Sequence, residues 1–134
     1  MSVAPEPSIA IHKAIIAALD SAVNCNVWDA VPPGAEYPYV TVDTIDTVAN
    51  DFLGGRRMDN RFVYLNIWSQ TPGQAEVLEI MGQIDSLHET ILTINGLGYV
   101  ADVRVERRRT TRDSDNLTFQ GQVTLRLIVR YGVV

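Results

Sequence analysis

Apolar residues recur along this chain at two spacings, one typical of helices and one typical of strands. From Ser8 to about Val23 they follow steps of three and four, which predicts an amphipathic helix with Ser8 as its cap. The expected apolar stripe consists of Ile9, Ile15, Ile16, Leu19 and Val23. A second helix is predicted to begin at a Thr71 cap, with Pro72 at its first position and an apolar stripe that extends to Ile91.

Five other segments are predicted to be strands, and three of them (39–45, 99–109 and 117–131) alternate apolar and polar residues with the period of two that a strand requires. They are 27–31, 39–45, 61–69, 99–109 and 117–131. The segment 61–69 is apolar on both sides, so one side is expected to pack on helices while the other needs a partner. The connections between strands are short, which predicts an antiparallel or mixed sheet with both helices on one face. The predicted fold class is therefore α+β.

Residues 46–60 form a polar segment that is too long for a tight hairpin. They predict either an extended loop or two projecting strand arms. Phe52 and Leu53 form an apolar pair within this segment, while Arg56 and Arg57 add to its mixed charge. Exposed apolar side chains gain nothing by ordering alone, so we expect these four residues to contact a partner or a neighbouring subunit; a flexible hairpin is the alternative.

Length and composition fit one folded domain, residues 1–134, with a flexible leader at 1–7. Hydrophobic residues make up 46% of the chain, enough for a core. Cys25 is the only cysteine, so no disulfide is expected within the chain. The start of the sequence lacks the apolar run of a signal peptide, and no stretch approaches the ~20 apolar residues of a membrane span. We expect a soluble protein that is not exported by this route.

Charge is distributed unevenly along the chain, whose net charge is −5. Residues 1–99 carry 4 basic and 12 acidic side chains, whereas residues 100–134 carry 7 basic and 4 acidic ones. The acidic total argues against a protein whose whole surface binds nucleic acid. Two surfaces of opposite charge suit head-to-tail packing of identical subunits, and a solvated strand face is the alternative.

The densest basic patch lies at the end of one predicted strand and in the turn after it. It consists of Arg104, Arg107, Arg108, Arg109 and Arg112. Arg126 and Arg130 on the next strand are expected to share its face. Three interpretations compete: ion pairs to an adjacent subunit, phosphate contacts with DNA, or a solvated edge that resists unwanted strand pairing. Subunit contacts come first, because only two aromatic residues flank the patch, too few for a platform that stacks single-stranded bases.

Motifs for catalysis, cofactor binding or metal binding are missing from the sequence. The Gly54-Gly55 pair lacks the lysine and the strand-to-helix setting of a phosphate-binding loop. His12 and His88 stand alone on their predicted helices, without ligand partners at helical spacing. We therefore expect no catalytic, cofactor-binding or metal site, and no enzymatic activity.

Four segments, in order, resemble the tail-completion or tail-terminator proteins of long-tailed phages and gene transfer agents. The first is VWDAVPPGA at 27–35 followed by YPYVTV at 37–42. The others are the strand end NIWS at 66–69, a helix that starts near Gln74, and DNLTFQG at 115–121. The resemblance covers nearly the whole chain. The arginine-rich turn departs from it.

This resemblance implies a structural protein of the virion tail, assembled in the host cytoplasm. It implies a hexameric ring that sits on the end of the tail tube, stops tube polymerisation and offers a docking surface to the head connector. Implied partners are further copies of the chain, the tail tube protein and the head-connector or adaptor protein, with non-specific passage of DNA through the ring. A head-tail adaptor or tail-tube protein is the nearer alternative. A nucleic-acid-binding module that uses the patch Arg104–Arg112 is the more distant one.

Overall fold

The computed structural model describes residues 8–51, 57–94, 99–112 and 118–130. Within them the order of elements is α1 (Ser8–Ala22), β1 (Asn26–Trp28), β2 (Tyr39–Asp51), β3 (Arg57–Ser69), α2 (Ala75–Asp85), β4 (Ile91–Ile94), β5 (Tyr99–Arg112) and β6 (Phe119–Arg130). The described strands form one mixed sheet in the order β1-β2-β3-β6-β5-β4, in which the β1–β2 pair is parallel and the others are antiparallel.

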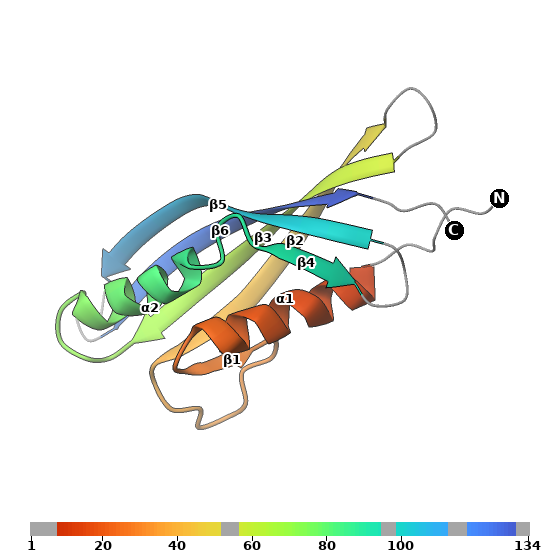
Figure 1. Cartoon of the computed structure of the whole chain (residues 1–134). Coiled ribbons are helices and arrows are strands. Elements are labelled where there is room, and N and C mark those ends of the chain that lie inside the picture. Colours follow the sequence, from red (N-terminus) through yellow and green to blue (C-terminus); the bar gives the residue numbers. More distant parts are fainter. Residues whose placement is uncertain (1–7, 52–56, 95–98, 113–117, 131–134) are drawn as a thin grey trace.

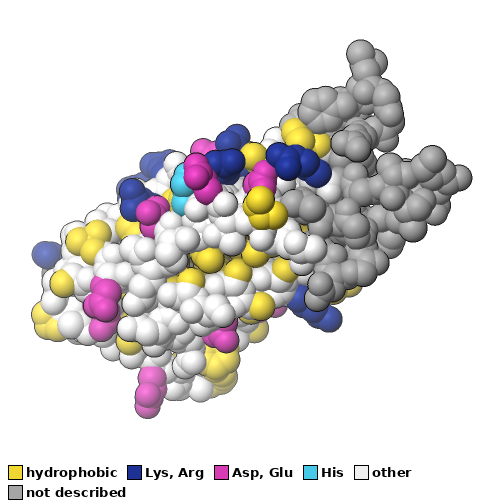
Figure 2. Space-filling view, in the orientation of Figure 1, with side chains coloured by type: hydrophobic (Ala, Val, Ile, Leu, Met, Phe, Trp, Pro, Cys, Tyr) yellow, Lys and Arg dark blue, Asp and Glu magenta, His cyan; other side chains and the backbone are white. Residues whose placement is uncertain are grey.

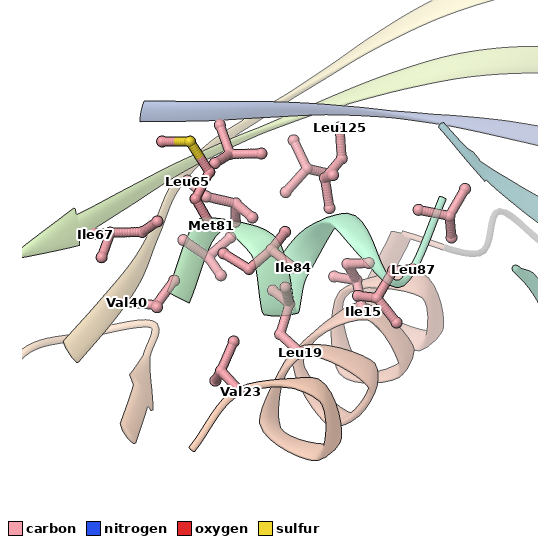
Figure 3. Packing of buried hydrophobic residues seen from close by; sticks show 14 of the residues in the cluster. Ile15, Leu19, Val23, Val40, Leu65, Ile67, Met81, Ile84, Leu87 and Leu125 are labelled. Atoms are coloured by element: carbon pink, nitrogen blue, oxygen red, sulfur yellow. The ribbon is translucent and has the colours of Figure 1, made fainter. Parts of the chain in front are cut away.

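Both helices lie on one face of this sheet, which curls over them (Figure 1). Alternate residues of the central strands point toward the helices, as the period of two requires. Val63, Leu65 and Ile67 of β3 are buried there, and so are Leu125 and Leu127 of β6. Ile15 and Leu19 from α1, and Ile84 from α2, meet these side chains in the core (Figure 3). The prediction of an α+β fold with both helices on one face is confirmed.

The polar segment 46–60 forms two strand arms, the second of the two structures that its sequence allows. β2 continues to Asp51 and β3 starts at Arg57, and the two pair residue by residue up to that end. The arms project beyond the rest of the sheet at the upper right of Figure 1. Phe52, Leu53 and Arg56 lie outside the described residues.

The second helix starts later than predicted, at Ala75. Gly73 has a φ of 89°, a left-handed conformation that cannot belong to a right-handed helix. The residue at the N-cap is Gln74, and it makes no side-chain capping bond. The expected cap at Thr71 and the helical position of Pro72 are therefore wrong.

The second helix also ends earlier than its apolar stripe predicts, at Asp85. Glu89 adopts a φ of 67°, and the chain then enters β4, which pairs with β5. Ile91, expected at the end of the helical stripe, is instead the first residue of that strand and 61% exposed. The strand β4 was not predicted.

One core position and two strand boundaries also differ from the sequence prediction. Ile9, expected in the apolar stripe, is 74% exposed, and Ile11 is buried in the core instead. The strand expected at 27–31 is β1, whose three residues pair with the first three residues of β2. β5 continues past its predicted end to Arg112, because it stays paired with β6 up to Phe119.

Candidate assembly surface

The face of the sheet that the helices do not cover carries aromatic, amide and hydroxyl side chains. Tyr64, in the middle of β3, is 38% exposed on this face. Trp68 donates its indole N–H to the Thr41 hydroxyl oxygen at 3.2 Å, so that the ring lies fixed on the surface. Gln120 likewise donates to the side-chain oxygen of Asn66 at 2.7 Å. We call this side the open face. These indole, hydroxyl and amide groups are hydrogen-bonded in place, which suits a preorganised contact surface.

A β-bulge in β5 divides the arginine patch between the two faces of the sheet. The register with β6 shifts between Val105 and Arg107. Beyond the shift, Arg107 lies opposite Thr124 and Arg108 lies opposite Val123. Directly paired residues share a face, and Val123 belongs to the core. Arg107 and Arg109 therefore lie on the open face, while Arg108 and Arg112 lie on the helix-covered face.

The two arginines on the helix-covered face have local partners. Nη1 of Arg108 lies 3.5 Å from Oδ1 of Asp85, at the end of α2. The guanidinium carbon of Arg112 lies 5.2 Å from the centre of the Phe119 ring, within the range of a cation–π contact. Both arrangements are partly exposed, so each contributes little to the stability of the monomer.

Most arginines of the open face are also paired within the chain. Arg126 contacts Glu106 at 2.7 Å, Arg130 donates to Asp102 at 2.9 Å, and Arg104 donates to Glu89 at 3.2 Å. The register between β5 and β6 shows that Arg126 and Arg130 share a face with part of the patch, because Arg126 lies directly opposite Arg104. Basic and acidic side chains accordingly alternate along the rim where β5 runs (Figure 2).

Arg107 and Arg109 differ from these paired arginines. Both are exposed, and in the part of the chain that the structure describes neither forms an ion pair. They line a hollow of about 260 Å³ on the open face together with Tyr64, Gln122 and Thr124. Two unneutralised guanidinium groups beside amide and hydroxyl groups can bind carboxylates of another protein or phosphate oxygens.

A second charged cluster, Asp59 with Arg61, lies inside the protein. The sequence places both residues in a polar, mixed-charge segment, yet Asp59 is 1% and Arg61 2% exposed. Nε and Nη2 of Arg61 donate to the two carboxylate oxygens of Asp59, and its Nη1 donates to the Ser8 hydroxyl at the start of α1. Residue parity is the signal that could have revealed this pair, because 59 and 61 alternate in step with the buried Val63 and Leu65.

Neither a metal-ligand cluster nor a thiol with a lowered pKa is found among the described residues. Within the described ranges no three His, Cys, Asp or Glu side chains come together as metal ligands. The imidazole Nδ1 of His88 accepts the backbone N–H of Val105 at 2.9 Å, which ties the segment between α2 and β4 to β5. Burial, and then the charge of Glu76, raises the pKa of the Cys25 thiol, so this thiol stays protonated at neutral pH.

Of the remaining predicted interface residues, Arg57 lies within the described part of the chain. Arg57 is the first residue of β3 and pairs in register with Asp51. Among the described residues no helix is both long and apolar enough to span a membrane.

The described chain is thus an α+β domain whose sheet has one helix-covered face and one open face. A chain in the solved structure titled "Virion of native gene transfer agent (GTA) particle" has the same fold, with a TM-score of 0.67, 18% sequence identity, and coverage of 92% of this chain and 90% of that chain. No curated protein sequence matches this chain.

A family model, described as tail completion protein gp17, matches residues 10–130. That span leaves out only a few residues at each end and includes every strand of the sheet. The protein is therefore a structural protein of the phage-type virion tail. It belongs to the tail completion protein gp17 family.

Proposed function

We propose that this chain forms a ring at the head-proximal end of the tail tube, stops tube polymerisation there, and presents a docking surface to the head connector. The observation that carries this proposal is the family match over 10–130, because completion of a tail requires a protein that ends its tube. The similar chain comes from a gene transfer agent virion, which supports a place in such a particle. A hexamer is the symmetry that the sequence resemblance implies.

The open face supports an assembly role over an enzymatic one. It is broad, it carries fixed aromatic and amide groups, and Arg107 and Arg109 lie on it without ion-pair partners among the described residues. A large, partly polar surface with aromatic and arginine side chains is typical of protein interfaces. The projecting arms of β2 and β3 give the same domain a second element that can reach a neighbouring subunit or the tube.

The nearest alternative, a head-tail adaptor or tail-tube protein, differs in where the ring sits and in whether copies polymerise without limit. The patch Arg104–Arg112 as a duplex-binding site is less well supported, because the bulge in β5 sends its arginines to two faces. A ring around a channel would still let DNA pass without sequence-specific contacts.

Deletion of the gene, followed by electron microscopy of the particles, tests the proposal. We expect overlong or ragged tails without heads, and we expect a plasmid copy of the gene to restore tails of uniform length. Tails of normal length joined to heads in the deletion strain would overturn the proposed function. Normal tails that lack heads would instead support the adaptor alternative.

A further inference from the structure

Two long strands, β2 and β5, have outer edges that are only partly covered. β1 pairs with residues 39–41 of β2 and with no later residue of that strand. On the other side, β4 pairs with residues 99–102 of β5. The chain before β4 adds backbone bonds to Val103, and His88 accepts the N–H of Val105. Within the described residues nothing pairs with the outer edge of β2 beyond 41 or of β5 beyond 105.

The two uncovered edges carry opposite charge. On β5 the exposed residues include Arg107, Arg108 and Arg109. On β2 they include Asp43 and Asp46. A strand edge has unpaired backbone groups at every second residue, and these groups can pair with the edge of another chain. Self-pairing of β5 would set arginine against arginine, and self-pairing of β2 would set aspartate against aspartate. Charge therefore favours pairing of unlike edges.

Strand direction permits this pairing between copies in the same orientation. Three antiparallel pairings separate β2 from β5, so the two edge strands run in opposite directions. The next copy, placed side by side without being turned over, therefore offers its β2 antiparallel to β5. We propose that the β5 edge of one copy adds to the β2 edge of the next, with Arg109 opposite Asp46, in a continuous head-to-tail sheet. This inference rests on the proposed function, whose ring it explains.

The position of the uncovered edges is compatible with closure into a ring. Arg109 is level with Asn66 of β3, whereas Asp46 is level with Phe62, four positions away. At ~3.3 Å per residue this offset is about 13 Å, and four strands at ~4.8 Å are about 19 Å wide. Pairing Arg109 with Asp46 would then tilt the strands by about 35°, within the range at which sheets close on themselves. Heterologous contacts of this kind build rings when the rotation closes.

A pair of cysteines tests the proposed register in intact particles. Antiparallel pairing with Arg109 opposite Asp46 also sets Thr111 opposite Thr44, on the same face, at a Cβ separation that a disulfide can bridge. In a Cys25→Ala background, we expect Thr111→Cys with Thr44→Cys to give a ladder of covalent oligomers after oxidation. Thr111→Cys alone and Thr44→Cys alone are the matched controls and should stay monomeric in non-reducing gels. A double variant that stays monomeric within tails of normal length would overturn the proposed edge contact, as would dimers of Thr111→Cys alone.

Charge reversal tests the pairing through assembly. Arg109→Asp and Asp46→Arg should each lower the yield of tails with heads by roughly tenfold or more, because like charges then meet. The double variant should restore most of the yield. Glu79→Arg, at an exposed position of α2, is the control for changed net charge and should assemble normally.

The remaining outcomes separate this inference from the proposed function. If deletion of the gene gives overlong tails but neither single reversal affects assembly, the edge contact is overturned and the proposed function stands. If Arg109→Asp alone is defective and Asp46→Arg does not rescue it, Arg109 contacts something other than the second copy. Loss of DNA retention in that variant, reversed by low salt, would assign the contact to phosphates.

Discussion

The two faces of the sheet differ in what their side chains do. The helix-covered face buries aliphatic residues of β3 and β6 against both helices, and its buried ion pair joins β3 to the start of α1. The open face holds aromatic, amide and charged groups, several of which form bonds within the surface. Substitutions on the first face should change the free energy of unfolding, whereas substitutions on the second should change assembly and leave the monomer folded.

The largest expected effect concerns the buried pair on the helix-covered face. Asp59→Ala removes the buried carboxylate that accepts two hydrogen bonds from Arg61, and we expect a loss of about 3–5 kcal/mol in the free energy of unfolding. Arg108→Ala removes an exposed ion pair and should cost at most about 1 kcal/mol. Urea denaturation measures both. Equal losses of stability in the two variants would show that the buried ion pair contributes no more than the exposed one.

Leu125 and Gln122 both belong to β6, where Leu125 lies on the helix-covered face and Gln122 on the open face. Substitutions at these two positions therefore compare the two faces. Leu125 is fully buried, so Leu125→Ala creates a cavity and should cost about 2–5 kcal/mol. Gln122 is exposed on the open face, and Gln122→Ala should change stability by no more than about 0.5 kcal/mol. Thermal unfolding of the purified variants checks the difference. A large effect at Gln122 would show that the open face also stabilises the monomer.

Alanine substitutions at Gly121 and at Gly82 should change the free energy of unfolding in opposite directions. A Cβ at Gly121 would lie 2.6 Å from Cγ1 of Val77, so Gly121→Ala would push α2 from the sheet and cost about 1–3 kcal/mol. Val77→Ala in the same chain should recover part of that loss. Gly82, within α2, has open space around its Cβ position, and Gly82→Ala should stabilise by about 0.5–1 kcal/mol. Destabilisation at both positions would refute the packing argument.

The smallest effect concerns Cys25, a half-buried residue directly before β1. Because burial raises its pKa from 9.0, the folded protein keeps this thiol protonated where an unfolded chain begins to ionise it. The contribution to stability is therefore present below about pH 9 and falls as the pH rises through the raised pKa. We expect alkylation at pH 8 to be slower in the folded protein than in urea. Equal rates in the two conditions would contradict this prediction.

Sequence periodicity predicted the fold class because β3, β5, β6 and α1 have long, regular patterns. It failed where a backbone conformation decided the structure. The end of α2 and the start of β4 depend on the left-handed conformation of Glu89, and a glutamate gives no local signal for it. Four residues are also too few to distinguish a short strand from the last turn of an apolar helix.

The candidate surface could be predicted only in part. The sequence shows the arginine patch as a charged feature, but its division between two faces depends on one extra residue in β5. A bulge is defined by the register with a partner strand, so it cannot be read from β5 alone. The proposed roles of Phe52, Leu53 and Arg56 remain predictions, since these residues lie outside the described part of the chain.

The most direct measurement is an electron cryomicroscopy reconstruction of the head-proximal end of the tail in intact particles. We predict a closed ring of this chain at that position, with the β5 edge of each copy against the β2 edge of the next and Arg109 near Asp46. A tail end that lacks this chain, or a ring whose copies leave both edges facing solvent, would contradict this prediction.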